Sequence, residues 1–191
     1  MAKGDGGSLR NGDARRAAEL IERIGRLLDG DLRQEGLHPA QGEALRYLAR
    51  ANRFSRTPAA LAAFLGSTRG TVSQTVIALE RAGHLSRSLS ARDRRSVALD
   101  LTASGRALAE RGLAALARDI ESGGQATALA SQLAAALSAA RAARGQRPFG
   151  ACRSCRYFGA AADPAAPYHC MLLDERLSAA DAEMICFEQA A

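Results

Sequence analysis

Between residues 57 and 101 two consecutive helix patterns are followed by an abrupt change of periodicity, and this order restricts the fold more than any other feature. The segment "TPAALAAFLG" predicts a helix that Thr57 caps, with Pro58 at its first position. Ser67 or Thr68 caps a second helix, "TRGTVSQTVIALERAG". The segments "HLSRSL" and "SVALDL" that follow predict a two-stranded hairpin joined by the basic loop "SARDRR".

Two short helices followed by a basic hairpin are typical of a winged helix-turn-helix, whose second helix enters the DNA major groove. Val72, Val76 and Leu79 can hold that helix on the core, which leaves its polar N-terminal half free. Hydroxyl groups on that half can donate to DNA phosphates, and arginine and glutamine can bind base edges. Arginines in the wing can lie against the DNA backbone or enter the minor groove. The residues expected at the DNA are Ser67, Thr68, Arg69, Thr71, Ser73 and Gln74 in the helix, and Arg92, Arg94 and Arg95 in the wing.

Each of these features alone is also typical of a solvated helix face or of a loop that protects an edge strand. The distribution of charge favours DNA. Residues 53–106 hold nine arginines against three acidic residues, whereas residues 151–191 hold three arginines against six. A basic middle and an acidic tail suit different partners, so we expect double-stranded DNA to meet the middle of the chain.

The remaining sequence predicts a mainly α protein in three parts. Residues 1–13 are rich in Gly, Asp and Ser and are expected to be disordered. Residues 14–145 form a helical domain around a winged-helix core at about 38–101. In that domain Leu45 and Leu48 face inward from a helix in "HPAQGEALRYLARAN", one helix covers "TASGRALAERGLAALARDIESG", and another runs over about 127–144. After "GQRP" comes the cysteine module, residues 146–191.

Several classes of function are not expected. No apolar run approaches the roughly 20 residues of a membrane span, and the polar N-terminus is not typical of a secretory signal. The sequence therefore predicts a cytoplasmic protein without a membrane partner. A nucleotide-binding glycine motif and paired catalytic carboxylates are both lacking, so no enzyme is expected.

The segments "GTVSQTVIALERAGHLSR" and "DRRSVALDLTASG" resemble the MarR family of bacterial transcriptional regulators, over about residues 14–145. The resemblance implies a homodimer, assembled from the first helix and the last two, that places two recognition helices on a palindromic operator. It also implies that Asp93 braces the wing through Arg95, and that Arg94 or its neighbour forms the wing tip. Many members bind small aromatic acids between the dimer helices and the winged helix, but no clear signature of such a pocket is present here.

All four cysteines lie in the last 40 residues. Cys152, Cys155, Cys170 and Cys186 form the pattern C-x2-C-x14-C-x15-C, and in a reducing compartment such clustering favours a bound metal over disulfides. Four thiolates suit tetrahedral zinc or an iron–sulfur cluster. A single C-x2-C knuckle with two isolated cysteines favours the larger cluster, whereas zinc modules usually carry two knuckles. A third interpretation is that Cys152 and Cys155 form a redox-active pair, but they do not follow the strand-to-helix pattern of thioredoxin-like sites.

The surroundings of these cysteines are rich in apolar residues that would shield a cluster from solvent. A module of this size also needs a core, so the same residues would suit zinc. The segment "CRSCRYF…YHCMLLDERLSAADAEMIC" is similar to the ligand region of high-potential iron–sulfur proteins, although Met184 and Ile185 stand where those proteins have Gly-Trp. The similarity implies a 4Fe–4S cluster, ahead of 2Fe–2S and zinc. The aromatic and aliphatic residues concerned are Phe149, Tyr157, Phe158, Tyr168, Phe187, Met171, Leu172, Leu173 and Ile185.

The sequence thus predicts a dimeric regulator, expected to be a repressor, whose cluster senses redox state, oxygen, iron or nitric oxide. The cysteine module directly follows the last helix of the predicted dimer interface. Folding of the module around a cluster is therefore expected to fix the distance between the two recognition helices. One alternative is a zinc-stabilised regulator that answers to a small molecule in the dimer cleft. Another is an electron-transfer role for the cluster itself.

Overall fold

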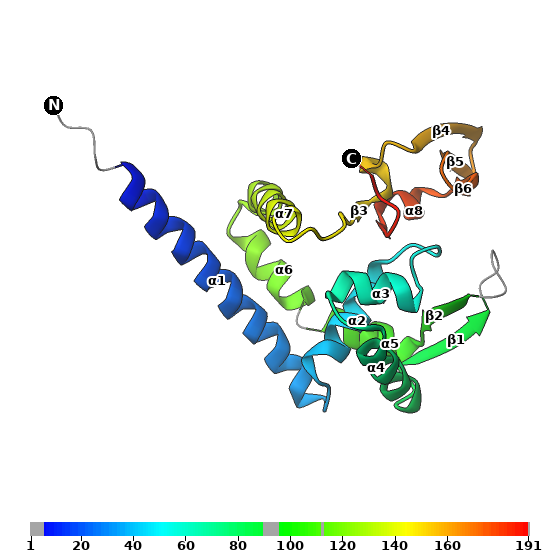
Figure 1. Ribbon diagram of the computed structural model, residues 1–191, viewed down its shortest axis with the longest axis horizontal. Helices are drawn as coiled ribbons and strands as arrows, with labels where there is room; N and C mark the ends of the chain where they lie inside the picture. The colour runs from blue at the N-terminus through cyan, green and yellow to red at the C-terminus, as the bar shows by residue number, and fades with distance from the viewer. Residues whose placement is uncertain (1–5, 90–95, 112, 191) are drawn as a thin grey trace.

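The computed structural model describes residues 6–89, 96–111 and 113–190, and Figure 1 shows their arrangement. The centre of the molecule is the expected winged helix, in which the antiparallel strands pair from Leu85 opposite Leu101 to Leu89 opposite Val97. Its elements are α2 (Pro39–Arg50), α3 (Pro58–Leu65), α4 (Arg69–Arg81), β1 (Leu85–Leu89), β2 (Val97–Leu101) and α5 (Ala103–Glu110).

The boundaries of α3 and α4 follow the capping signals in the sequence. The Thr57 side chain accepts a hydrogen bond from Ala60 N, and Gly66 ends α3 with a φ of 60°. The Thr68 hydroxyl accepts from Thr71 N, so Thr68, and not Ser67, caps α4. Each cap satisfies a backbone donor that the first helical turn leaves unpaired.

The core of the winged helix lies where α2, α3 and α4 meet strand β2. Leu45 and Leu48, predicted to face inward, are 0% and 2% exposed. The buried apolar residues of this core include Leu32, Leu45, Leu48, Leu61, Val72, Val76, Leu79, Leu85, Leu99 and Leu101.

Three helices flank this core: α1 (Gly6–Gln34), α6 (Leu113–Ser122) and α7 (Ala126–Ala142). Helix α1 begins at Gly6, inside the segment 1–13 for which the sequence predicts disorder, and residues 1–5 lie outside the described residues. Adding residues to an existing helix is far less costly than nucleating one, so a helix of this length extends into a weak helix former.

The single helix expected after residue 102 is two helices. Helix α5 ends at Glu110, and α6 begins at Leu113. Arg111 adopts an extended conformation with φ −62° and ψ 141°, which breaks the helical hydrogen bonding. The sequence signal for this break is the glycine that follows, since Gly is the poorest helix former after Pro.

The cysteine module is built from short strands and turns that the sequence did not resolve. Strands β4, β5 and β6 form one antiparallel sheet, and β3 pairs with β7. Its elements are β3 (Gly150–Ala151), the 3-10 turn η1 (Cys152–Ser154), β4 (Phe158–Asp163), β5 (Ala166–Cys170), β6 (Glu175–Leu177), α8 (Ala179–Glu183) and β7 (Ile185–Cys186).

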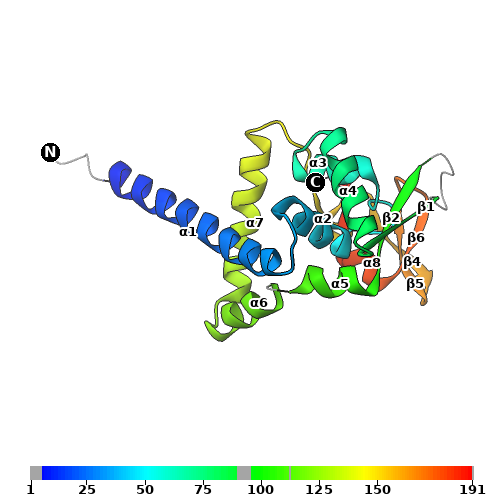
Figure 2. The ribbon, with the colours of Figure 1, turned by 90° about the horizontal axis from the view of Figure 1, so that it is seen from below.

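Figures 1 and 2 both place strands β4–β6 at the same end of the molecule as the wing strands β1 and β2, away from the N-terminal end of α1. The cysteine module therefore lies against the winged helix and not beyond the flanking helices. Among the described residues no helix is long and apolar enough to cross a membrane.

The close approach of α5 to the turn after α4 generates the first prediction. A Cβ atom at Gly105 would lie 2.0 Å from the backbone oxygen of His84. We expect Gly105→Ala to lower the free energy of unfolding by about 1–3 kcal/mol, because backbone must move to admit the methyl group. Gly70→Ala in α4 is the control, since a Cβ there meets nothing nearer than the Thr68 hydroxyl at 3.8 Å. Urea unfolding followed by circular dichroism measures both, and equal stability of the two variants would contradict the expectation.

Candidate nucleic-acid interface and cysteine pocket

Helix α4 presents the polar face that the sequence predicts. Val72, Thr75, Val76 and Leu79 are buried and fix the helix on the core. The residues expected at the DNA lie on the opposite side: Thr68, Arg69, Thr71, Ser73 and Gln74 are exposed, and Ser67 is half-buried.

The base of the wing is tied to the rest of the winged helix by two ion pairs that sequence reasoning missed. Arg87 in β1 binds Glu80 in α4 and holds the pKa of that carboxyl below its usual value through the hydrogen bond. Arg56 Nη1 lies 2.9 Å from Asp100 Oδ1 in β2. The wing strands are thus oriented from both sides, by α4 and by the chain before α3.

The wing tip itself lies outside the described residues. Arg92, Asp93, Arg94 and Arg95 belong to the segment 90–95, so their contacts with DNA and the brace between Asp93 and Arg95 stay predictions.

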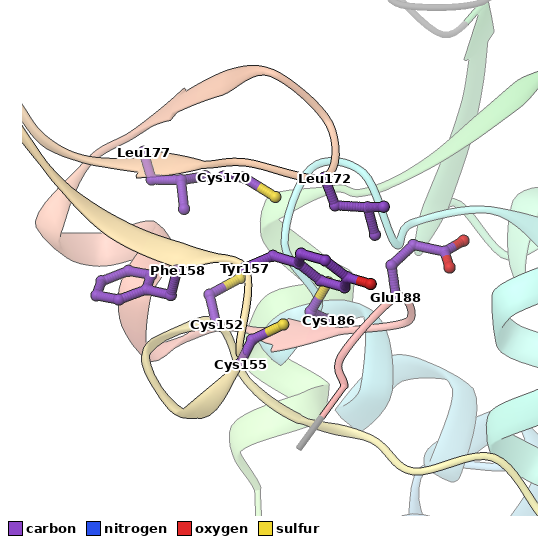
Figure 3. Close-up of a pocket in the computed structure, with 9 residues that line it drawn as sticks. All are labelled: Cys152, Cys155, Tyr157, Phe158, Cys170, Leu172, Leu177, Cys186 and Glu188. Atoms are coloured by element: carbon purple, nitrogen blue, oxygen red, sulfur yellow. The ribbon is translucent and has the colours of Figure 1, made fainter.

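All four cysteines line one pocket, which is the second candidate site (Figure 3). Cys152 and Cys155 lie on a single turn, in which Cys155 N donates to Cys152 O at 3.0 Å. Cys170 ends β5, and Cys186 ends β7. The cavity between these side chains is small, about 10 Å³. The other residues that line it are Tyr157, Phe158, Leu172, Leu177 and Glu188.

Nitrogen donors reach the sulfur atoms of Cys152, Cys155 and Cys186. Asn52 Nδ2 lies 3.2 Å from Cys152 Sγ, and Ala190 N lies 3.4 Å from Cys155 Sγ. A hydrogen bond from Cys152 lowers the pKa of Cys186 to about 6 by stabilising its thiolate. The same contact, together with burial, raises the pKa of Cys152.

The chemistry of this donor set fits a sulfur-liganded metal centre. Thiolates select zinc and iron–sulfur clusters, and hydrogen bonds to the sulfurs are among the features that tune a cluster. As the side chains are placed, no group of three or more His, Cys, Asp or Glu in the described chain could hold a metal ion. The four thiols surround a pocket and do not converge on one point.

The apolar shell expected around the cysteines is only partly present. Tyr157 and Phe158 line the pocket, and Tyr168 packs on Phe158 with 4.6 Å between the ring centroids. Met171 is 60% exposed. Phe149, Ile185 and Phe187 pack instead on the winged-helix core, because β3 and β7 lie against the chain between α2 and α3.

The chain between α2 and α3 is a functional segment that sequence reasoning did not identify. We call residues 51–57 the α2–α3 loop. Asn52 and Ser55 in this loop are each 1% exposed, although loops with polar side chains usually lie in solvent. Their partners in the cysteine module, Cys152 and Phe187, lie 100 and 132 residues away, so local sequence patterns carry no signal for these contacts.

A second, larger cleft lies between α1, α2, α7 and the start of the cysteine module. It has a volume of about 1000 Å³ and is open to solvent. Arg46, Arg50 and Arg141 border it, and among the described residues Arg46 Nη1 and Arg141 Nη2 are buried without a hydrogen-bond partner. Burial lowers the pKa of Arg141, whose guanidinium also lies 4.6 Å from the Phe149 ring centroid.

Comparison with known proteins gives one family match. The MarR family model matches residues 35–96, which run from the chain before α2 to the wing. This segment is therefore similar to the MarR family. Comparison with curated proteins gives no match.

Solved structures show the same fold. A variant of MepR from a multidrug-resistant Staphylococcus aureus clinical isolate is 24% identical, with a TM-score of 0.54, over 68% of this chain and 95% of that one. MepR in complex with DNA is 24% identical, with a TM-score of 0.50, over 68% and 96% of the two chains. MepR alone, a transcription regulator of the S. aureus multidrug efflux pump MepA, is 23% identical, with the same TM-score and coverage. The chain thus has a MarR-like winged-helix fold.

Proposed function

We propose that this chain is a sequence-specific DNA-binding transcription regulator, acting as a repressor. The observation that carries the proposal is the exposed polar N-terminal half of α4, on a helix whose opposite face is buried in the core. An arginine and a glutamine on that half, Arg69 and Gln74, have the donor groups that read base edges in the major groove. MepR, which has the same fold, has been crystallised with DNA.

The proposed regulator is a homodimer formed through the flanking helices. Helix α1 exposes an apolar stripe that includes Leu20, Ile21, Ile24 and Leu27, the last of them 70% exposed. Helix α7 exposes leucines one turn apart on one face, and neither α6 nor α7 has a buried residue within the single chain. Helices of this kind bury their apolar faces in a partner, and a two-fold dimer places two recognition helices on a palindromic operator. The exposed leucines of α7 are Leu129, Leu133 and Leu137.

Substitution at the start of α4 tests the interface. We expect Arg69→Ala to weaken binding to an operator selected from random DNA by about 10- to 100-fold, since one good base contact is worth about 1–3 kcal/mol. Arg81→Ala, which removes the same charge from the exposed last turn of α4, is the matched control and should change affinity much less. Fluorescence anisotropy at fixed salt measures both, and equal losses would indicate a general charge effect.

We further propose that the cysteine pocket holds an iron–sulfur cluster, 4Fe–4S ahead of 2Fe–2S, and that DNA binding depends on it. The support is that four thiols from three separate parts of the module line one pocket, while nitrogen donors reach Cys152 Sγ and Cys155 Sγ. Cys152, Cys155, Cys170 and Cys186 would be its ligands. A bound cluster would supply sensitivity to redox state, oxygen, iron or nitric oxide.

The chain's own residues would shield and orient that group. Tyr157 and Leu172 border the pocket, and Leu177 at the end of β6 also lines it and is 1% exposed. Such apolar walls limit the access of water and oxidants to the sulfurs. Phe158 lines the pocket as well, and the Tyr168 ring packs on it from the neighbouring strand β5.

The colour and metal content of protein purified without oxygen test the cluster directly. We expect a brown protein with about four iron and four inorganic sulfide per chain, and loss of both in Cys170→Ser. Ser154→Ala is the control, because Ser154 lies between the paired cysteines but its hydroxyl bonds only the backbone of Ala151 among the contacts described. A colourless, folded protein with one zinc per chain would contradict the cluster.

A second candidate signal is an anionic small molecule in the cleft between α1, α2 and α7. The observation in its favour is the pair of buried guanidinium nitrogens without hydrogen-bond partners among the described residues, on Arg46 and Arg141. Carboxylates pair with guanidinium groups through two parallel hydrogen bonds. Regulation by such a ligand is compatible with either zinc or an iron–sulfur cluster in the cysteine module.

A further inference from the structure

The α2–α3 loop contacts the cysteine module and the wing at the same time. It is a short segment, yet it contains two of the most deeply buried polar residues in the described chain, Asn52 and Ser55. A buried polar group without partners costs about 1–3 kcal/mol, so the position of the loop depends on the groups that satisfy these side chains.

On one side the partners belong to the cysteine module. Asn52 Nδ2 reaches Cys152 Sγ at 3.2 Å, and Asn52 N donates to Ile185 O at 2.9 Å. Phe187 N donates to Ser55 Oγ at 2.8 Å. The residues on either side of the ligand Cys186 thus hold the loop, and Asn52 touches a second ligand directly.

On the other side the partners belong to the wing. Leu99 N in β2 donates to Arg56 O at 2.7 Å, and the Arg56 guanidinium pairs with Asp100 in the same strand. Tyr47 donates from its buried hydroxyl to Ser55 O at 2.8 Å and fixes the loop on α2. Only three residues therefore separate Asn52, which contacts the cysteine sulfur, from Arg56, which contacts the wing strand.

We propose that the α2–α3 loop transmits the state of the cysteine pocket to the wing, with Asn52 as the positioning residue that senses the Cys152 sulfur. The inference rests on the proposed metal centre. When Cys152 is a ligand its sulfur is a thiolate, and the Asn52 amide donates to a charged acceptor. When Cys152 is a free thiol, its sulfur is a weak acceptor and the hydrogen bond from Asn52 weakens. The α2–α3 loop is then held less firmly, and strand β2 loses the contacts that Arg56 makes with it.

The ion pairs of Arg53 with the cysteine module do not involve the sulfurs of the pocket. Arg53 Nη1 lies 2.7 Å from Asp181 Oδ2, and Arg53 also approaches Glu175, but its side chain is 42% exposed. Exposed ion pairs contribute little to stability, and this one touches none of the four sulfurs. Arg53→Ala therefore serves as the matched control for a variant at Asn52.

Hydrogen exchange of the β2 segment, residues 97–101, tests the proposal by mass spectrometry. Wild type, Asn52→Ala and Arg53→Ala are each measured as purified without oxygen and after chelation of the iron, with absorption spectra of every sample. In wild type and Arg53→Ala we expect removal of the iron to speed exchange in this segment about tenfold, by loss of the Leu99 and Asp100 contacts. In Asn52→Ala exchange should be fast in both states.

Three results decide the matter. Equal exchange in the two wild-type states, with the cluster present in one, overturns the proposal, as does a full response in Asn52→Ala. The comparison of wild type before and after removal of the iron does not depend on any variant. It therefore still tests the proposal if the Asn52→Ala protein fails to fold. A colourless wild type overturns the proposed cluster instead. The loop is then tested by wild type against Asn52→Ala alone, where faster exchange in the variant supports the loop and equal exchange overturns it.

Discussion

The burial of Asn52 is the constraint on which the arrangement of this molecule depends. Its amide is enclosed in protein, where each donor and acceptor must find a partner. The side-chain oxygen accepts from Phe54 N within the α2–α3 loop, and the side-chain nitrogen donates to Cys152. The buried polar groups of the α2–α3 loop have all of their hydrogen-bond partners only when the cysteine module lies on the loop. The same loop contacts the wing strand β2 through Arg56.

Apolar packing makes this contact part of the protein core. Phe149, at the entry to the cysteine module, packs edge-on against Phe64 of α3 with 5.2 Å between centroids, and it also contacts Phe187. Tyr47 and Arg141 complete the cluster from α2 and α7. The module is therefore joined to the winged helix and to a flanking helix at once. A change in the cysteine module can act on the wing through the α2–α3 loop. Because the module follows α7 in the chain, the same change can also act on the spacing of the two recognition helices.

The local features of the fold were predictable from the sequence because local interactions produce them. Caps at Thr57 and Thr68, the inward face of α2 and the wing strands all follow from periodicity and capping residues within a few positions. The break after Glu110 was missed because the single glycine that follows Arg111 is a weak signal inside a long helical pattern. The clustering of the cysteines in one pocket was expected. The role of Asn52 was not, since its partner lies 100 residues away and a short polar loop resembles any solvent-exposed turn.

The most direct test of the account is the operator affinity of one oxygen-free preparation, measured before and after removal of its iron at a fixed salt concentration. If the pocket holds a cluster and the α2–α3 loop links it to the wing, affinity should fall by about tenfold on removal, within the usual range of coupling between sites. Affinity that stays the same, in a sample that was brown at the start, would contradict the account and leave the cysteines with a structural role.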